Sequence, residues 1–367
     1  MIGPQHEKEL NMKKTIRRLY RVLRGLTMRA VKIGFRKLVK ESNAYYKKYC
    51  LLARDFGVSA DASYKLNLLY EYASHLRFVS HLPSSYVLDI VPRQFQRDCL
   101  LPVTNPLDLK WRMTNKVEFY KLLIQNKLPH PETWFYVEHG VALDLGGKKH
   151  VPRTDLNGTL LFAKTIGGSL GKGAEIVMYD ASLKFLRENF VYQKIMQVHS
   201  SIRELADVES LSTIRIHSYL RKNGTVEIQS AHLKLGVVGL TDNIGTGGIG
   251  VPINLEDGCC LKFGFREIGK KRLYDKHPMG MRPFEGACIP YWKETRDLLN
   301  MLHKVFCDLR SVGWDIAITE DGPVVIEGNS GGDIMIPQFF IRPFFETDMI
   351  QENMRRDRHS SPLNKLT

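Results

Sequence analysis

The stretch GWDIAITEDGPVVIEGN, from Gly313 to Asn329, decides the fold. It contains two apolar runs, Trp314–Thr319 and Val324–Glu327, and the residues between them are typical of a turn. Such an arrangement predicts a β-hairpin. Asp315 falls on the first strand and Glu327 on the second, so the pattern brings acids from both strands into one hairpin.

Three oxygen-bearing side chains of this hairpin form a predicted metal site. Glu327 and Asn329 are two residues apart, so in an extended strand they point the same way, and Asp315 joins them from the other strand. Mg²⁺ prefers carboxylate and amide oxygens and completes its shell with water and nucleotide phosphates. Mn²⁺ is an alternative ion for such a set. The competing interpretation is an exposed hairpin whose acids merely face solvent.

An apolar strand that ends in a lysine, Leu160–Lys164, leads into a glycine-rich loop at residues 165–173. Glycines let backbone N–H groups approach phosphate oxygens closely, and a lysine adds a cation. The loop is not a Walker A motif, because Ile166 and Gly173 stand where that motif needs Gly and Ser or Thr. We predict a flexible lid over a nucleotide, with an ordinary glycine-rich hairpin as the alternative. Its residues of interest are Gly167, Gly168, Gly171 and Lys172.

A second glycine-rich segment, GTGGIG at residues 245–250, matches the dinucleotide-binding fingerprint letter for letter. That fingerprint requires a strand before it and a helix after it. Asp242-Asn243 precedes the segment, and Pro252 opposes a helix start after it. We therefore reject a dinucleotide-binding fold and predict a turn that lets the backbone approach a substrate or phosphate.

The rest of the chain is predicted to be helical first and mixed afterwards. The spacing of apolar residues predicts helices and strands in that order. Helices are expected at residues 13–40, with breaks at Gly25 and Gly34, and then at residues 58–80, 113–125 and 292–309. Strands are expected at residues 160–165, 175–179, 191–196, 213–220 and 226–235.

Basic residues are concentrated near the N-terminus. The chain of 367 residues has a net charge of +14, and residues 1–60 hold 15 Lys and Arg but four Asp and Glu. Residues 13–40 combine this charge with a helical apolar pattern, which predicts helices packed on the main body with a solvated basic face. Attachment to an anionic membrane surface or an acidic partner is the alternative. Nucleic acid is not expected, because no reading module is recognisable.

Composition and cysteine spacing predict a cytoplasmic protein. A hydrophobic fraction of 43% with 25% charged residues is ordinary for a globular protein. No apolar run is long enough for a spanning helix, and no secretory signal is recognisable. The six cysteines form no CxxC pair, so their spacing predicts neither a zinc site nor a disulfide framework, and a reducing cytoplasm is expected.

The order of these motifs resembles the ATP-grasp superfamily, and most closely its sugar-transfer-associated branch. The resemblance covers about residues 100–340. It is carried by Asn115-Lys116 at a helix start, the Lys164 strand, the loop 167–173, YQKIMQVH at 192–199, SLSTIRI at 210–216, Asp242-Asn243 with Gly247-Gly248, and the set Asp315, Glu327 and Asn329.

The resemblance implies an α+β ATP-grasp fold with an N-terminal helical extension and a role for each matching residue. The boundaries it implies are 1–99 for the extension, 100–345 for the core (lid subdomain about 130–196, catalytic and metal subdomain about 197–345) and 346–367 for a polar tail. The nucleotide would be bound by Lys116, Lys164, Gly167, Gly168, Gly171, Asp242 and Asn243, and the hinge that reads adenine would be formed by Gln193, Lys194, Ile195 and Met196, with His199 near the ribose. Lys172 would act from the lid, and Arg215 would meet the transferring phosphate. The metal would be held by Asp315, Glu327 and Asn329. A buried ion-pair partner is the alternative role for Arg215.

The activity implied by the resemblance is ATP-dependent ligation. An ADP-forming carboxylate–amine ligase would use ATP and Mg²⁺ to activate a carboxylate for attack by an amine, in surface polysaccharide or sugar-conjugate synthesis. Two alternatives stay open: a kinase of the same fold that phosphorylates a small molecule or sugar, and a non-catalytic ATP-binding protein at a membrane surface. The expected location is the cytoplasm, with peripheral attachment to the inner face of the membrane as an alternative.

Overall fold

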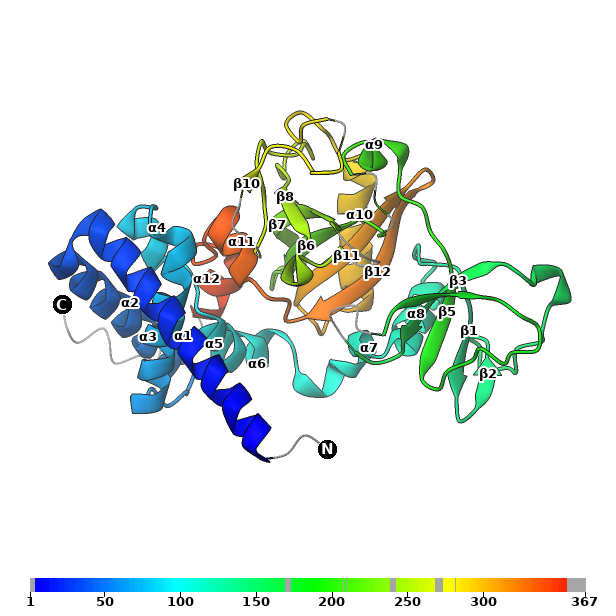
Figure 1. The fold of residues 1–367 in the computed structure, drawn as a ribbon, viewed down its shortest axis with the longest axis horizontal. Coiled ribbons are helices and arrows are strands. Elements are labelled where there is room, and N and C mark those ends of the chain that lie inside the picture. Colours follow the sequence, from blue (N-terminus) through cyan, green and yellow to red (C-terminus); the bar gives the residue numbers. More distant parts are fainter. Residues whose placement is uncertain are drawn as a thin grey trace. The chain divides into compact units, whose positions relative to one another are not determined.

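The structure is a computed structural model that describes residues 4–168, 173–206, 208, 210–237, 242–267, 273–280 and 282–354, with the side chains of residues 4–16 and 18 excepted (Figure 1). The chain divides into two units. One unit comprises residues 1–103 and 333–367, and the other comprises residues 104–332.

The first unit is helical in its described residues. Its longer helices are α1 (Pro4–Ile33), α2 (Phe35–Asp55) and α3 (Ala62–Val79), and its shorter ones are α4 (Ser84–Leu88), α5 (Arg93–Phe95), a π-helical turn (Gln96–Leu100), α6 (Leu101–Thr104), α11 (Met335–Phe340) and α12 (Asp348–Met354). The predicted break at Gly34 is confirmed, because Gly34 separates α1 from α2 with a φ of 83°. Asp61 caps α3 by accepting from the backbone N–H of Tyr64, which explains why that helix starts later than predicted.

The predicted break at Gly25 is wrong, and its cause is packing. Gly25 lies inside α1, and a Cβ atom there would lie 2.1 Å from the carbonyl oxygen of Ala73 on α3. The glycine therefore permits a close approach of the two helices, and this packing offsets the lower helix propensity of glycine. Nearby, the fully buried Arg29 pairs with Glu41 of α2, and Glu41 also accepts from the hydroxyl of Tyr72 at 2.8 Å.

The segment after residue 332 packs with the first unit. Gln338 of α11 accepts from the backbone N–H of Val91 at 2.7 Å, and Phe339 stacks on Phe78 with ring centroids 5.0 Å apart. The boundaries 1–99, 100–345 and 346–367 stay a prediction, and the division into two units differs from them by placing residues from 333 onward with residues 1–103.

In the described residues of the second unit, the main elements are two antiparallel sheets and the helices α7 to α10. The smaller sheet has the order β2-β1-β5-β3-β4. Its strands are β1 (Thr133–Glu138), β2 (Val141–Leu143), β3 (Leu160–Thr165), β4 (Glu175–Met178) and β5 (Phe190–Lys194), and α7 (Trp111–Thr114) and α8 (Lys116–Gln125) precede them. The predicted helix at 113–125 is divided at Asn115, whose side chain caps α8 by accepting from two backbone N–H groups.

The larger sheet has the order β10-β9-β8-β7-β6-β11-β12. Its strands are β6 (Thr213–Leu220), β7 (Val226–Leu235), β8 (Ile249–Pro252), β9 (Gly264–Phe265), β10 (Leu273–Tyr274), β11 (Ser311–Thr319) and β12 (Gly322–Ser330), with α9 (Ser200–Arg203) and α10 (Trp292–Val305) beside them. Strands β6 and β7 match the predicted ranges, and β11 with β12 confirms the predicted hairpin.

The two faces of the larger sheet differ in character because side chains alternate along each strand. One face carries Ile214, Ile216 and Leu233, which form a core with Leu298 and Leu302 of α10. The other face carries the residues between them in sequence, and these are polar and charged. The apolar face holds the sheet in place and leaves the opposite face available for chemistry.

One cysteine prediction is wrong. Cys259 and Cys288 form a disulfide across an isolated β-bridge, whereas Cys50, Cys99, Cys260 and Cys307 are free thiols. The two bonded cysteines are 29 residues apart, and no spacing motif reports such a pairing. A cytoplasmic location stays a prediction.

No helix in the described part of the chain combines the length and apolar character needed to cross a bilayer.

Candidate functional site

A row of polar side chains crosses four strands of the larger sheet. His232 of β7 lies opposite Arg215 of β6, Arg215 lies opposite Asp315 of β11, and Asp315 lies opposite Glu327 of β12. Residues directly opposite one another in an antiparallel sheet project from the same face. Asn329 follows on that face, two residues after Glu327, so the register brings the predicted metal set together.

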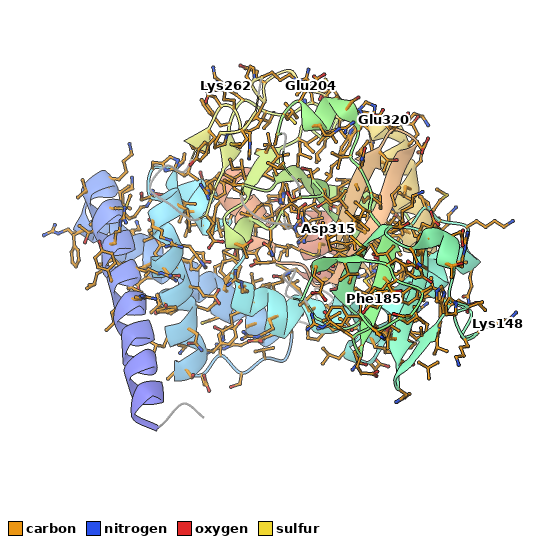
Figure 2. The ribbon with its side chains drawn as sticks, turned by 45° about the vertical axis from the view of Figure 1, so that its right-hand side comes forward. Lys148, Phe185, Glu204, Lys262, Asp315 and Glu320 are labelled. Carbon is orange, nitrogen blue, oxygen red and sulfur yellow. A yellow bond between two sulfur atoms is a disulfide. The ribbon has the colours of Figure 1, made fainter. Side chains whose placement is uncertain are left out.

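Asp315 is the buried centre of this row. Only 3% of its surface is exposed, and its carboxylate accepts from Arg215 at both oxygens, at 2.6 Å from Nε and 2.9 Å from Nη2. The ammonium group of Lys234 lies 3.2 Å from the same carboxylate. Burial alone would raise the pKa of Asp315, but the two cations outweigh it and hold that pKa well below its usual range. Figure 2 shows Asp315 among the side chains of the second unit, with Glu320 nearer its edge.

A second, partly buried acid extends the charge network. Asp242 accepts from the backbone N–H of Thr213 at 2.9 Å and lies 3.2 Å from the ammonium group of Lys234. Burial raises the pKa of Asp242, and the charge of Lys234 opposes that shift. The two positive charges of Arg215 and Lys234 thus balance the two negative charges of Asp315 and Asp242. Glu327 stands outside this balance as a further negative charge on the same face.

The oxygen set fits a hard divalent cation. The amide nitrogen of Asn329 donates to the carboxylate of Glu327 at 3.2 Å, which leaves the amide oxygen of Asn329 available as a ligand. Among the described residues, no three His, Cys, Asp or Glu side chains group as a metal site. The candidate set contains two acids and one amide, and Mg²⁺ commonly takes its remaining ligands from water and phosphate. The metal role of this set stays a prediction.

Two buried lysines approach this site from the smaller sheet and from α8. Lys164, at the end of β3, donates to the hydroxyl of Tyr120 at 2.8 Å, and Lys116, at the start of α8, donates to the carbonyl of Gly168 at 3.2 Å. Each lysine is 8% exposed, and no carboxylate of the described residues forms an ion pair with either. The hydroxyl of Tyr120 also donates to the carbonyl of Ile326, next to Glu327, and so links Lys164 to the strand that carries Glu327.

Burial and mutual repulsion make the lysine pair suited to an anion. Burial and, to a lesser degree, the charge of Lys164 together lower the pKa of Lys116 to about 8, although the charge of Glu327 opposes the shift. Two desolvated ammonium groups without a carboxylate in contact are stabilised when a multiply charged anion such as a nucleotide phosphate enters. Binding of nucleotide by Lys116 and Lys164 stays a prediction.

Replacing Lys116 with methionine should change stability and nucleotide affinity in opposite directions. Lys116→Met keeps the apolar stem and removes the repelled charge, so we expect the free energy of unfolding without nucleotide to rise by about 1–2 kcal/mol. The Kd for MgADP should rise about 10–100-fold, because charge-assisted contacts to phosphate are lost. Denaturant titration and calorimetry measure the two effects.

Lys121→Met is the matched control for this change. Lys121 lies on the same helix and pairs with Glu118 at 2.9 Å on the surface, so its replacement should alter neither quantity beyond about 0.5 kcal/mol. If Lys116→Met lowered the stability and left the Kd unchanged, Lys116 would be a structural residue.

The glycine-rich loop is described only in part. Gly168 has a φ of 123°, a conformation that side-chain-bearing residues rarely adopt, and its carbonyl accepts from Lys116. Gly167 has open space around the position of a Cβ atom. Gly171 and Lys172 lie outside the described residues, so their roles in a lid stay predictions.

The predicted hinge lies between the two sheets of the second unit. Gln193 is buried and donates to the hydroxyl of Thr133 at 2.8 Å, while Lys194 is exposed and lies 3.5 Å from Glu132. Residues 195–199, including Ile195 and Met196, connect β5 to α9 without regular secondary structure. The location suits a hinge, and the adenine contact stays a prediction.

Two residues that were predicted to contact the nucleotide have local structural roles. His199 caps α9 and lies 3.2 Å from the carboxylate of Glu320. Asn243 caps the 3₁₀ turn Ile244–Thr246 by accepting from the backbone N–H of Gly245 at 2.9 Å. Their contact with nucleotide is untested. The adjoining glycine segment is a turn followed by β8, which confirms the rejection of a dinucleotide-binding fold.

Sequence reasoning missed Lys234, His232 and Tyr120. Lys234 and His232 alternate with buried apolar residues along β7, as Arg215 does along β6. A polar residue at every second position of an otherwise apolar strand signals a functional face, and this signal was available. Tyr120 offered no such signal, because it lies among apolar helix residues.

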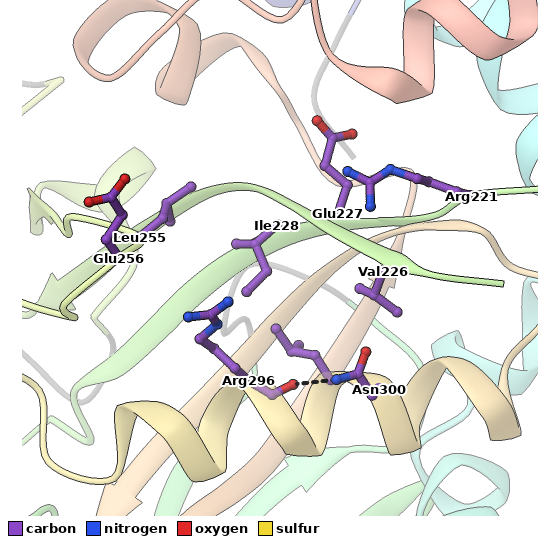
Figure 3. Close-up of a pocket in the computed structure, with 9 residues that line it drawn as sticks. Arg221, Val226, Glu227, Ile228, Leu255, Glu256, Arg296 and Asn300 are labelled. Carbon is purple, nitrogen blue, oxygen red and sulfur yellow. Dashed lines mark hydrogen bonds between the residues drawn. The ribbon is translucent and has the colours of Figure 1, made fainter. Parts of the chain in front are cut away.

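A cavity of about 440 Å³ lies elsewhere in the second unit. Figure 3 shows it between α10 and the start of β7, lined by residues that include Arg296, Asn300 and Ile228. None of the predicted site residues lines it. The candidate site is therefore the polar face of the larger sheet with the lysine pair.

Comparison with protein families agrees with this geometry. Residues 178–342 match the model of the family described as sugar-transfer associated ATP-grasp. The ATP-grasp resemblance is confirmed. The matched ATP-grasp segment contains Arg215, Asp315, Glu327 and Asn329, and the predicted α+β ATP-grasp fold with an N-terminal helical region is also confirmed.

Solved structures similar to this chain share little sequence with it. N5-carboxyaminoimidazole ribonucleotide synthetase from Thermotoga maritima is 12% identical, with 62% of this chain and 47% of that chain covered and a TM-score of 0.35. L-amino acid ligase from Bacillus licheniformis is 14% identical, with 60% and 40% covered and a TM-score of 0.33. The chain thus spans less than half of either protein.

A third similar structure is the ATP-grasp ligase PsnB, complexed with a phosphomimetic variant of its minimal precursor, Mg and ADP. It is 13% identical, with 81% of this chain and 74% of that chain covered and a TM-score of 0.37. No protein of curated function matches the sequence.

Proposed function

We propose that this ATP-grasp protein is a Mg-ATP-dependent ligase that activates a carboxylate as an acyl phosphate for attack by an amine. The observation that carries the proposal is the convergence of two buried lysines with an acidic, oxygen-rich strand pair. Tyr120 joins the two groups through its bonds to Lys164 and to the backbone beside Glu327. Cations for phosphate and oxygens for a divalent metal then share one site, as transfer of a phosphoryl group requires.

Arg215 has the geometry to meet the transferring phosphate. Its Nε and Nη2 are occupied by Asp315, whereas its Nη1 makes no hydrogen bond within the described part of the chain. Burial would lower the pKa of Arg215, but the adjacent Asp315 raises it, so the guanidinium stays charged. A fixed, permanently charged donor stabilises negative charge that spreads over the phosphoryl oxygens in the transition state.

The remaining roles are part of the same proposal. Lys116 and Lys164 hold nucleotide phosphates, and Glu327 and Asn329 with Asp315 hold the metal. Mg²⁺ when bound neutralises phosphate charge. Lys172 and the glycine loop close over the site and exclude water from the acyl phosphate. An amine that arrives neutral needs no dedicated general base for its attack.

The substrate class proposed is a sugar-linked or amino-acid carboxylate with an amine acceptor. The support is the description of the matching family, which is associated with sugar transfer. A role in surface polysaccharide or sugar-conjugate synthesis is part of this proposal. Mn²⁺ is an alternative metal, because carboxylate and amide oxygens also suit it.

An ADP-release assay with hydroxylamine present tests the proposal. The purified chain is given ATP, Mg²⁺ and a panel of amino acids, acidic sugars and amino sugars. ADP release together with hydroxamate formation is expected, because hydroxylamine traps acyl phosphates. A stable phosphorylated product without hydroxamate would assign the kinase alternative, and AMP formation would overturn both.

A further inference from the structure

The exposed surface of α1 and the start of α2 combines apolar side chains with cations. The exposed apolar residues are Leu19, Tyr20, Leu23, Met28, Val31, Phe35 and Val39, with exposed fractions between 38% and 84%. The exposed cations are Arg17, Arg21, Arg24, Lys32, Arg36, Lys37 and Lys40. We call this set the α1–α2 surface.

The two kinds of residue occupy adjoining sectors of α1. With 3.6 residues per turn, Leu19, Tyr20, Leu23 and Val31 fall within about 120° of the helix circumference. On the same basis, Arg17, Arg21, Arg24 and Lys32 fall within the next sector of about 80°. The remaining sector carries Gly25 and Arg29, which are buried against the helical unit. The helix thus has one packed side, one exposed apolar side and one basic side.

Acidic residues are missing from the exposed part of this surface. Glu41 is the one acid between residues 10 and 54, and it is buried in its pair with Arg29. The exposed cations of residues 17–40 form no ion pair with the described residues. Their charge is therefore uncompensated within the described chain and available to an anionic partner.

We propose that the α1–α2 surface docks on an anionic lipid bilayer. Exposed apolar side chains enter the boundary between headgroups and acyl chains, and flanking arginines and lysines reach the lipid phosphates. A polyanion without apolar surface, such as nucleic acid, would pair with the cations and leave Leu23, Val31 and Phe35 in water. The adjacency of apolar and basic sectors therefore favours a bilayer, and this docking is peripheral.

Vesicle sedimentation of the full chain tests the docking. Vesicles of phosphatidylcholine with an added fraction of phosphatidylglycerol should bind the protein, and vesicles of phosphatidylcholine alone should bind it weakly. Each cation near an anionic surface strengthens binding about fivefold, so the triple variant R21Q/R24Q/K32Q should bind about 100-fold more weakly. The apolar triple variant L23S/V31S/F35S should lose at least about tenfold.

The matched control is K148Q/K149Q/K184Q, which removes three exposed lysines from the second unit and should bind like the unmodified chain. Unchanged circular dichroism and unfolding midpoints establish that all variants fold, as expected for exposed positions. If the charge variant lost vesicle binding while the apolar variant kept full binding, the surface would adhere to any polyanion, and the proposal would be overturned. Equal binding to neutral vesicles, or an equal loss in the control, would also overturn it.

Discussion

Glu327→Gln is expected to reduce ADP release by about 10³-fold and to leave the fold intact. The variant keeps the shape and hydrogen-bonding capacity of the side chain but removes one negative charge from the predicted metal set. Glu327 is partly exposed on the polar face and forms no ion pair with the described residues, so its charge is not needed for packing. A steady-state ADP-release assay with saturating Mg²⁺ measures the effect, and the unfolding midpoint measures the stability.

Glu320→Gln is the matched control on the same hairpin. Glu320 lies at the turn between β11 and β12, where it accepts from the backbone N–H of Ser200 at 2.7 Å and lies beside His199. It has no contact with the polar row, so its replacement should leave turnover within about twofold. Unchanged turnover in Glu327→Gln would contradict both enzymatic interpretations and support the non-catalytic alternative.

The parts of the site that follow from strand periodicity could be predicted from the sequence. The spacing of Glu327 and Asn329, and the placement of Asp315 on the partner strand, depend on alternation and on a short turn alone. The register confirms the outcome, because Asp315 lies directly opposite Glu327. Local patterns thus predicted the hairpin and the placement of its acids, whereas metal binding stays a prediction.

The contacts between distant segments could not be predicted in the same way. Arg215 and Asp315 are 100 residues apart, and their direct opposition depends on β6 and β11 being neighbours in the sheet. Arg215 forms an ion pair with the buried Asp315, as the alternative role for it predicted, although Arg215 itself is only partly buried. Its role at the phosphate stays a proposal. The alternation along β7 could have marked Lys234 as a residue of the polar face, but its two acidic partners could not be predicted, because only the sheet order places them beside it.

Gly25 illustrates how packing can override local signals. A glycine inside a helical pattern ordinarily lowers confidence in the helix. Here the missing side chain admits the Ala73 carbonyl of a helix that begins almost forty residues later, so the glycine supports the helix pair. The sequence alone shows the low helix propensity of glycine, but it does not show the tertiary contact that offsets this cost.

Replacing Asp315 should cause a large loss of stability, and a double-mutant cycle separates this structural role from a role in catalysis. Asp315→Leu leaves the partly buried guanidinium of Arg215 without its bidentate partner, and breaking a largely buried pair in this way costs about 3 kcal/mol of stability. Arg215→Met should cost a similar amount, because Asp315 then keeps only Lys234. Denaturant unfolding of both single variants measures these losses.

The double variant Arg215→Met/Asp315→Leu should be more stable than either single variant, by at least about 2 kcal/mol, since two well-packed apolar residues can replace a buried ion pair. Lys234 still pairs with Asp242 in that variant, so no buried charge is left alone. ADP release should nevertheless stay at the level of the single variants, because neither the metal ligand nor the phosphate donor is restored. Additive losses of stability would show that the pair is not coupled, whereas recovered turnover would show that the row serves the fold and not the reaction.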